Sequence, residues 1–456
     1  MLSALLIKPE DVDTKEKRAK YTVTTIGSEQ NSLFYSCLLA DAGYNVLCTD
    51  HDQTLVNLLS KGRIPFARHE AEATLKDHVR KGHIVATGDF KTAISKGNII
   101  MINTPVEIDQ KRKPDYSNIE KASKLVGASI GQNSLVIISS TVGVGVVEGL
   151  IRETLENASG FKIGTDIGLA YSPIRISQVQ DLEKQPNQEQ IVAACDKTSL
   201  NAASTVLETV SPSGIKRTLS VKTAEVAVLF EAAQREVNGA LANEFAVLCE
   251  KAGADYMEAQ KLKAHMLVMF PSLAHSDAST EDASYLLLED AENLSMKLRT
   301  VAVARETNEE MARHAANLVG DALRNCGRTF RRAKVSILGI SEIPNMKSPP
   351  KRLVKKLAKI MEKRGAKINV YDPYFSDDSA DAGRSMKKTL AETLEGANCI
   401  VLVTPHDQLK RLSLNKLKIV MKMPAAIVDL AGVFESEKVE KEGFLYRGLG
   451  RGVWKK

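Results

Sequence analysis

The 456-residue sequence lacks several features that would assign a protein quickly to a class. It has no run of eighteen consecutive apolar residues, so we expect no membrane-spanning helix. Its six cysteines form no C-x-x-C pair, which argues against a zinc or disulfide framework. They stand mostly in apolar runs and are predicted to be buried thiols of a reducing compartment. The N-terminus has no basic leader and no cleavage site, which favours a cytoplasmic protein.

A strong charge bias is also missing. The formal net charge is only +6, and the cations are dispersed among acids, as in KLAKIMEKRGAK at residues 356–367. This mixture is typical of a solvated helix face. We therefore expect neither nucleic acid nor a membrane as a partner.

The apolar pattern predicts an α/β fold. Short apolar runs at 21–27, 44–49, 98–103, 134–139 and 167–171 alternate with helix-like stretches, as in a parallel sheet covered on both faces. From 222 to 325 the pattern is almost purely helical, with a long helix ending at Gly253. Strand and helix alternation resumes at KVSILGI, residues 334–340. We predict two Rossmann-like doubly wound domains joined by a long helical spine.

The first strand-to-helix turn is poor in glycine. VTTIGSEQNSLF, residues 23–34, keeps Gly27 of the dinucleotide fingerprint G-x-G-x-x-G but has Glu29 and Ser32 at the other two glycine positions. Asp50 ends the next apolar run, where an acid would hold a ribose. A carboxylate about 4 Å from a phosphate costs on the order of 4 kcal/mol at a dielectric of 20, roughly a thousandfold in affinity. We therefore expect no dinucleotide cofactor.

Several longer motifs carry a resemblance to a known family. They are INTPVEIDQKRKPDYSNIE, VIISSTVGVGVVEGL, GLAYSPIR, TAEVAVLFEAAQREVNGALANEFAVLCEKAGAD, RGAKINVYDPYF, VLVTPHDQL and AIVDLAGVF. In this order and spacing they resemble the UDP-glucose/UDP-N-acetylmannosamine dehydrogenase family, particularly its archaeal branch. The first 20 residues, a short apolar stretch followed by mixed charge, are expected to form a short surface arm. The resemblance implies an NAD-type domain at 21–213, a central helical dimerisation domain at 214–324 and a UDP-sugar-type domain at 325–456.

The resemblance also implies a catalytic apparatus, and the chain departs from it. Family members oxidise a sugar-nucleotide alcohol to the acid with two NAD molecules, using a cysteine, a lysine, an asparagine and an aspartate. The family's glycine-rich nucleophile loop corresponds to residues 270–285, FPSLAHSDASTEDASY. At the four catalytic positions stand Ser279 for the cysteine, Val228 for the lysine, Ala232 for the asparagine and Ala283 for the aspartate.

Other family positions are retained. The resemblance places vestigial cofactor contacts at Gly27, Asp50, Thr104, Pro105 and Thr141. It places weak substrate contacts at Arg235, Asn238 and Lys347, although helix packing or dimer contacts account for Arg235 and Asn238 equally well. Lys347 stands nearest to the family's hinge arginine, and a point charge does not reproduce a planar bidentate contact.

Two functions remain open. The first is a catalytically degenerate homologue that binds a sugar nucleotide as a sensor or pairs with an active paralogue. The alternative is a working NAD-dependent UDP-sugar 6-dehydrogenase that uses the substituted residues. In either case the spine helix predicts a homodimer or heterodimer, because it carries a broad apolar stripe formed by Leu229, Phe230, Val237, Leu241, Phe245 and Leu248.

Overall fold

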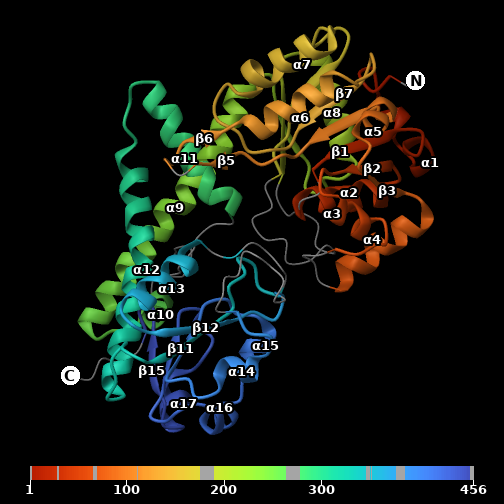
Figure 1. Cartoon of the computed structure of the whole chain (residues 1–456). Coiled ribbons are helices and arrows are strands. Elements are labelled where there is room, and N and C mark those ends of the chain that lie inside the picture. The colour runs from red at the N-terminus through yellow and green to blue at the C-terminus, as the bar shows by residue number, and fades with distance from the viewer. Residues whose placement is uncertain are drawn as a thin grey trace. The chain divides into compact units, whose positions relative to one another are not determined.

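The computed structural model describes residues 3–27, 30–64, 69–109, 111–174, 189–262, 278–345, 350, 352–375 and 386–451. For residues 30, 31, 69–71 and 278–282 it describes the backbone alone. The chain forms two compact units (Figure 1). Unit 1 comprises Met1–Ala232 and Asp282–Lys297, and unit 2 comprises Ala233–Glu281 and Leu298–Lys456.

Unit 1 contains an eight-stranded sheet in the order β10-β9-β8-β7-β4-β1-β2-β3. Its neighbouring strands run parallel, except that β8 and β9 are antiparallel. The strands are β1 Thr22–Ile26, β2 Asn45–Thr49, β3 Ile84–Thr87, β4 Ile99–Ile102, β7 Leu135–Ile138, β8 Gly168–Tyr171, β9 Gln190–Ala194 and β10 Ile215–Thr218. A separate hairpin pairs β5, Glu107–Ile108, with β6, Pro114–Asp115.

Helices cover both faces of this sheet. They are α1 Lys15–Arg18, α2 Gln30–Ala42, α3 Gln53–Leu59, α4 His69–Lys81, α5 Phe90–Lys96, α6 Ser117–Gly127, α7 Arg152–Ser159 and α8 Lys197–Glu208. One core cluster joins Val23, Ile99 and Leu135 of the strands to Leu39 of α2 and Leu207 of α8. On the other face, α5 and α6 lie against β1 and β4. The central strands are therefore buried on both faces, as their continuous apolar sequence predicts.

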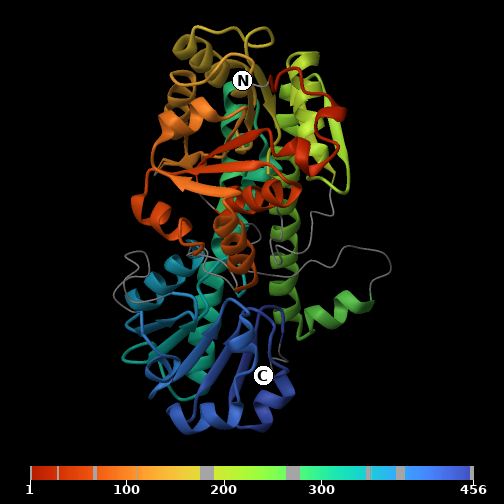
Figure 2. The same cartoon turned by 90° about the vertical axis from the view of Figure 1, so that its right-hand side faces the viewer.

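The long helix α9, Val221–Ala252, is green in Figures 1 and 2. Its 32 residues correspond to about 48 Å at 1.5 Å per residue. The boundary between the two units falls within it, between Ala232 and Ala233. The helix α11, Ala278–Asn293, likewise contributes its first residues to unit 2 and the rest to unit 1.

Unit 2 contains a five-stranded parallel sheet in the order β12-β11-β13-β14-β15. The strands are β11 Lys334–Leu338, β12 Lys367–Tyr371, β13 Cys399–Leu402, β14 Ala426–Asp429 and β15 Leu445–Gly448. The described helices of this unit, besides its part of α9, are α10 Tyr256–Leu262, α12 Arg299–Asn325, α13 Arg352–Lys363, α14 Leu390–Leu394, α15 Asp407–Lys410, α16 Leu414–Val420 and α17 Ser436–Lys441. The order 2-1-3-4-5 is that of flavodoxin-like doubly wound sheets.

Two core layers hold the sheet of unit 2. Val335 and Ile337 of β11 pack with α12 and α13, whereas Ile400 and Ile427 pack on the opposite face with Leu417 of α16. Figure 1 shows α12 and α13 on one side of these strands and α14 to α17 on the other. The side chains of alternate residues along a strand therefore pack into two separate cores.

The predicted fold class is confirmed: both units are Rossmann-like, with parallel strands and helices on both faces. The five expected apolar runs of unit 1 each contain a strand, whereas β3, β9 and β10 were not predicted. The proposed domain boundaries stay a prediction. None of the helices in the described part of the chain combines the length and hydropathy of a membrane span.

The segment expected as a surface arm differs from its prediction. Ala4, Ile7 and Val12 are buried and belong to the core cluster of unit 1. The N–H groups of Ala4 and Leu5 donate to the carbonyl oxygen of Asn133 at 3.0 and 3.1 Å. Because these apolar side chains are buried in the core, the described part of the segment belongs to the folded unit.

Candidate functional site

The first candidate site is the carboxyl edge of the unit 1 sheet, where β1 lies between β4 and β2. Doubly wound sheets bind nucleotides at this switch point, because the connections leave neighbouring strands in opposite directions. Residues that the resemblance assigns to the cofactor lie along this edge. They are Gly27 after β1, Asp50 after β2, Thr104 and Pro105 after β4, and Thr141 beyond the end of β7.

Gly27 has a structural reason to be glycine. Its φ of +92° is strained for any residue with a side chain, and an added Cβ would lie 3.1 Å from the carbonyl oxygen of Asn103. Its N–H donates to the carbonyl oxygen of Thr49 at 3.0 Å. The geometry of the strand end therefore requires this glycine whether or not a ligand binds.

Asp50 also has an internal role. Its carboxylate accepts a hydrogen bond from the backbone N–H of Asp52 at 2.9 Å. Asp52 in turn caps α3 and accepts from the N–H of Thr54 at 2.8 Å. The acid at the ribose position thus shapes the turn into α3.

Of the two glycine positions of the fingerprint that hold another residue, the structure describes only Ser32. Ser32 lies on α2 and is 2% exposed, at the position where the fingerprint's third glycine permits close packing of helix on strand. A serine is small enough to be accommodated there. Glu29 lies outside the described residues, so its repulsion of a pyrophosphate stays a prediction.

The loop after β7 directs backbone N–H groups at two acids of unit 1. The N–H of Val144 donates to Asp290 Oδ2 at 2.8 Å. The N–H groups of Gly145 and Val147 donate to the two carboxylate oxygens of Glu225 at 2.6 and 3.0 Å. Donors of this kind bind anions in nucleotide folds. Here they are satisfied by the chain's own carboxylates.

Burial sets the protonation of this acidic cluster. Burial, opposed by the two backbone hydrogen bonds, raises the pKa of Glu225 to about 7. Burial also raises the pKa of Asp290. Tyr116 lies beside them, and burial together with Asp290 raises the pKa of its hydroxyl. An added Cβ at Gly143 would lie 2.5 Å from the Tyr116 hydroxyl, so the loop has no space for a side chain at that point.

Three of the four positions that the resemblance assigns to catalytic residues are held by buried apolar side chains. Val228 and Ala232 on α9 are 6% and 3% exposed, and Ala283 on α11 is 1% exposed. None of the three side chains can donate or accept a hydrogen bond. Ser279 lies in the first turn of α11, so the expected loop at 270–285 is helical from Ala278 onward. The side chain of Ser279 lies outside the described part.

The surroundings of the six cysteines bear on whether any of them can act as a nucleophile. All six cysteines are free. Burial raises the pKa of every one of these thiols, and it raises those of Cys37 and Cys195 to about 12. A catalytic thiol needs a lowered pKa, because the thiolate is the nucleophile. No cysteine of the chain meets that requirement.

The expected substrate contacts lie in unit 2. Arg235 and Asn238 are half-buried on α9. The Nε atom of Arg235 is buried and has no hydrogen-bond partner within the described ranges, which leaves a donor for an anionic group. Lys347 lies outside the described residues.

The second candidate site is the carboxyl edge of the unit 2 sheet, where Asp372 follows β12. Asp372 and His406 are both buried, and Asp372 Oδ2 accepts from His406 Nε2 at 3.0 Å. The same oxygen accepts from the N–H groups of Ile340 and Ser341 at 2.7 and 2.9 Å. His406 Nδ1 accepts from the N–H of Asn345 at 2.8 Å, so the ring proton stands on Nε2.

The network holds Asp372 in its charged form. Burial alone would raise the pKa of this carboxyl, but the hydrogen bond from His406, with the backbone donors of Ser341 and Tyr374, lowers it. The acid therefore ties the loops after β11 and β13 to the end of β12. The carboxylate and the backbone N–H groups at this edge of the sheet therefore satisfy one another by hydrogen bonds inside the protein.

Sequence reasoning missed Glu225, Asp290, Asp372 and His406 as site residues. The motifs that contain Glu225, Asp372 and His406 were used for the resemblance without assigning these residues contacts, and Asp290 lies in none of the motifs. A signal existed for two of them: Glu225 interrupts the apolar run AEVAVLF, and Asp372 directly follows the strand INVY. In the part of the chain that the model describes, no group of three or more histidine, cysteine or acidic residues could hold a metal ion.

Family models match three consecutive parts of the chain. The NAD binding domain of the UDP-glucose/GDP-mannose dehydrogenase family matches residues 21–211, the central domain matches 222–310 and the UDP binding domain matches 337–436. Together the three models cover most of the sequence in the order of the family.

Known proteins agree with these matches. A UDP-N-acetyl-D-mannosamine dehydrogenase of Pyrococcus horikoshii is 27% identical over 94% of this chain and 99% of that protein. A UDP-glucose 6-dehydrogenase of Rhizobium meliloti is 25% identical over 94% of this chain and 99% of that protein. The solved structure of a UDP-D-ManNAc dehydrogenase from P. horikoshii superposes with a TM-score of 0.83 at 25% identity, covering 94% of this chain and 99% of that one. The chain therefore belongs to the UDP-glucose/GDP-mannose dehydrogenase family.

Proposed function

We propose that this chain is a catalytically degenerate member of its family that acts by binding, as a regulatory or partner subunit. The observation that carries the proposal is the absence of an activated thiol. The nucleophile position holds Ser279, and burial raises the pKa of each of the six cysteines. A covalent thioester mechanism needs a thiolate, and a serine needs an adjacent base to take its place.

The buried apolar residues on α9 support the same proposal. The positions of the lysine and the asparagine are held by Val228 and Ala232, which are packed away from solvent. One oxyanion donor contributes roughly two to three powers of ten in rate. Loss of the nucleophile and both donors leaves a rate on the order of 10⁴-fold or more below that of a complete enzyme.

For the cofactor we propose that the chain binds no NAD. The N-terminal domain keeps the fold of an NAD binding domain. Support for the proposal comes from Glu29 and Ser32 at two glycine positions, and from the loop after β7, whose amides already hold Glu225 and Asp290.

For assembly we propose a homodimer, or a heterodimer with an active paralogue, through α9. Leu241, Phe245 and Leu248 recur at four- and three-residue spacing and are 37%, 44% and 59% exposed. Such a stripe is typical of a helix with a partner. Leu229, which was expected in the stripe, is fully buried.

The six free thiols favour a reducing compartment such as the cytoplasm.

The alternative is an active NAD-dependent UDP-sugar 6-dehydrogenase, which the names of the full-length relatives favour. An assay of NADH formation separates the two. With NAD and UDP-glucose or UDP-N-acetylmannosamine we expect no turnover under conditions in which the P. horikoshii enzyme is active. Turnover by the unmodified chain that is lost in Ser279→Ala would establish the alternative.

Ligand binding is tested separately by thermal shift with NAD, NADP, and UDP- and GDP-sugars. A ligand at a hundred times its dissociation constant stabilises by about 2.7 kcal/mol. The double variant Glu29→Gly with Ser32→Gly is expected to gain NAD binding without gaining turnover. If NAD stabilises the unmodified chain as strongly as the double variant, the cofactor part of the proposal fails.

A further inference from the structure

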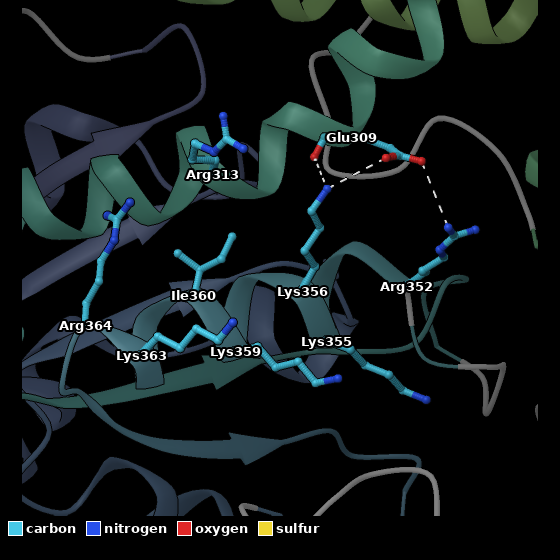
Figure 3. A pocket seen from close by; sticks show the side chains of 9 residues that line it. All are labelled: Glu309, Arg313, Arg352, Lys355, Lys356, Lys359, Ile360, Lys363 and Arg364. Atoms are coloured by element: carbon cyan, nitrogen blue, oxygen red, sulfur yellow. Dashed lines mark hydrogen bonds and ion pairs between the residues drawn. The ribbon is translucent and has the colours of Figure 1, made fainter. Parts of the chain in front are cut away.

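A groove of about 600 Å³ lies in unit 2 between α12 and α13 (Figure 3). Arg313 faces it from α12, and Ile360 lies at its centre. The remaining cations of its lining come from α13 and the residue that follows: Arg352, Lys355, Lys356, Lys359, Lys363 and Arg364. The groove is thus a cationic surface built by two consecutive elements of one unit.

The packing of α13 explains why the cations gather here. Leu353, Val354, Leu357 and Met361 are buried in the core beneath the helix. Because these residues repeat at three- and four-residue spacing, the lysines between them must point away from the sheet. The cations that are dispersed among acids along the sequence are brought onto one face by the helix.

Charge in the groove is poorly neutralised. Glu309 is the one acid among the described residues of its lining. Its carbonyl oxygen accepts from Lys356 Nζ at 3.0 Å, and its carboxylate lies 3.8 Å from that atom and 4.0 Å from Arg352. Among the described residues, Lys355, Lys359 and Lys363 have no acidic partner within 4.0 Å. Seven cations less one acid leave a formal charge of +6 on this lining, as much as on the whole chain.

The other charged groups near the groove change this balance little. Arg313 lies 3.7 Å from Glu310, and both side chains are about two-thirds exposed. Exposed pairs of this kind are weak and are screened by salt. The guanidinium of Arg364 lies 5.5 Å from the centre of the Phe330 ring, which orients it without neutralising it.

We propose that this groove binds double-stranded nucleic acid through its phosphodiester backbone. The composition of the lining decides between polyanions. Protein interfaces are depleted in lysine and enriched in aromatic residues, whereas the described residues that line this groove include four lysines and three arginines and no aromatic side chain. Lysine and arginine are the residues that contact phosphates. The concave shape and the burial of the apolar face of α13 disfavour a membrane, into which that face would have to insert.

The same composition predicts which nucleic acids bind and whether their base sequence matters. Single strands are held by aromatic side chains on which the bases stack, and the lining offers none. Contacts to phosphates carry no sequence information. Binding is therefore independent of sequence, prefers a duplex and weakens steeply with salt as counterions are released. The sequence-based expectation of no nucleic-acid partner treated these cations as dispersed.

The test is the fluorescence anisotropy of a labelled 20-base-pair DNA duplex of arbitrary sequence, titrated with the full chain between 50 and 300 mM KCl. The groove variant is Lys355→Gln with Lys359→Gln and Lys363→Gln. We expect at least tenfold weaker binding at 50 mM KCl, and a slope of log K against log salt that is smaller by about 3, since each phosphate contact contributes about 0.9.

The matched control is Lys416→Gln with Lys418→Gln and Lys422→Gln. It removes the same charge from exposed positions of unit 2 outside the groove and should bind within about threefold of the unmodified chain. Circular dichroism checks that both variants are folded. Equal loss in the two variants, or no duplex binding at 50 mM KCl, would overturn the proposal.

Additional ligands distinguish the source of the negative charge. Duplex RNA should bind with a similar salt slope, because it offers the same phosphodiester groups. Poly-glutamate and vesicles containing anionic phospholipid should bind at least tenfold more weakly than the DNA at equal charge. If either binds more tightly than DNA and loses that binding in the groove variant, the occupant is a different class of partner and the nucleic-acid assignment is wrong.

Discussion

The carboxyl edges of the two sheets shift the pKa of a buried acid in opposite directions. Each places a buried acid where loops leave parallel strands. In unit 1, burial raises the pKa of Glu225 to about 7 although two backbone N–H groups donate to it. In unit 2, the pKa of Asp372 is lowered, because His406 adds a side-chain hydrogen bond to those of the backbone donors. A buried carboxylate at a sheet edge is therefore stable as an anion where a side-chain partner joins the backbone amides.

The comparison also separates two uses of a nucleotide-binding edge. The donors of both edges are aimed at internal acids. A ligand phosphate would compete with Glu225 and Asp290 in unit 1, which are held less firmly as anions. In unit 2 it would have to displace a fully hydrogen-bonded Asp372. A ligand phosphate would therefore displace the internal acids of unit 1 more easily than the internal acid of unit 2.

The largest expected effect comes from Asp372→Ala. The substitution leaves His406 and the N–H groups of Ile340 and Ser341 without their acceptor inside the protein. Each buried donor left without an acceptor costs about 1–3 kcal/mol, so we expect a loss of about 3–5 kcal/mol in the free energy of unfolding. Urea denaturation followed by circular dichroism measures it. The control Glu435→Ala removes an exposed acid paired with Lys438 and should change stability by less than about 0.5 kcal/mol. Similar losses in both variants would contradict the contrast between the edges.

A second prediction concerns the pH dependence of unit 1. The folded chain holds the Glu225 proton up to about pH 7, whereas the ordinary pKa is 4.5. The folded state therefore binds more protons between these values, and the contribution of Glu225 to stability falls as pH rises through this window. Glu225→Gln does not titrate. Relative to the unmodified chain it should gain about 1–3 kcal/mol between pH 5 and pH 8 in urea denaturation. A constant difference across that range would show that Glu225 is not protonated by folding.

A third, smaller effect is expected at the strand end of unit 1. Gly27→Ala combines a strained φ with the approach of Asn103, and should cost about 2 kcal/mol. The control Gly82→Ala has a φ of +75° and no atom within 4 Å of the added Cβ. It should cost about 1 kcal/mol, from strain alone. If the two variants are equally stable by thermal denaturation, the close approach at Gly27 has no energetic consequence.

The smallest effect is expected from Lys113→Gln. Lys113 pairs with Glu289 and Glu292 on α11, beside the acid Asp290, and its side chain is half-exposed. Because exposed pairs are screened, the variant should lose little stability at low salt and none at 0.5 M KCl. A large loss that persists at high salt would mean that Lys113 is a necessary counter-charge of the acidic cluster.

The fold was predictable because local pattern and tertiary role agree over most of the chain. Residues 135–138 are all apolar because neighbouring residues of the strand, such as Leu135 and Val136, are fully buried on opposite faces. The edge strand β10, with Lys216 and Arg217 exposed, carries no comparable pattern. Long helices are predictable for the same reason, since their spacing repeats over many turns.

For the site, the resemblance assigns Val228, Ala232 and Ala283 to catalytic positions, and that assignment stays a prediction. The structure shows that all three side chains are buried. The internal hydrogen bonds were not predictable. Glu225 and Val147 are separated by 78 residues, and Asp372 and His406 by 34. Tertiary structure alone brings such pairs together, and an isolated acid in an apolar run does not name its partner.

The protonated thiols have a practical consequence. Cys37, Cys48, Cys326 and Cys399 are buried in the two units, and burial raises the pKa of each. In the folded chain they should resist alkylation at neutral pH, and each should become reactive when its own unit opens. Two of these cysteines lie in each unit. Mass spectrometry of iodoacetamide labelling during urea unfolding would therefore report the opening of the two halves separately, without any engineered probe.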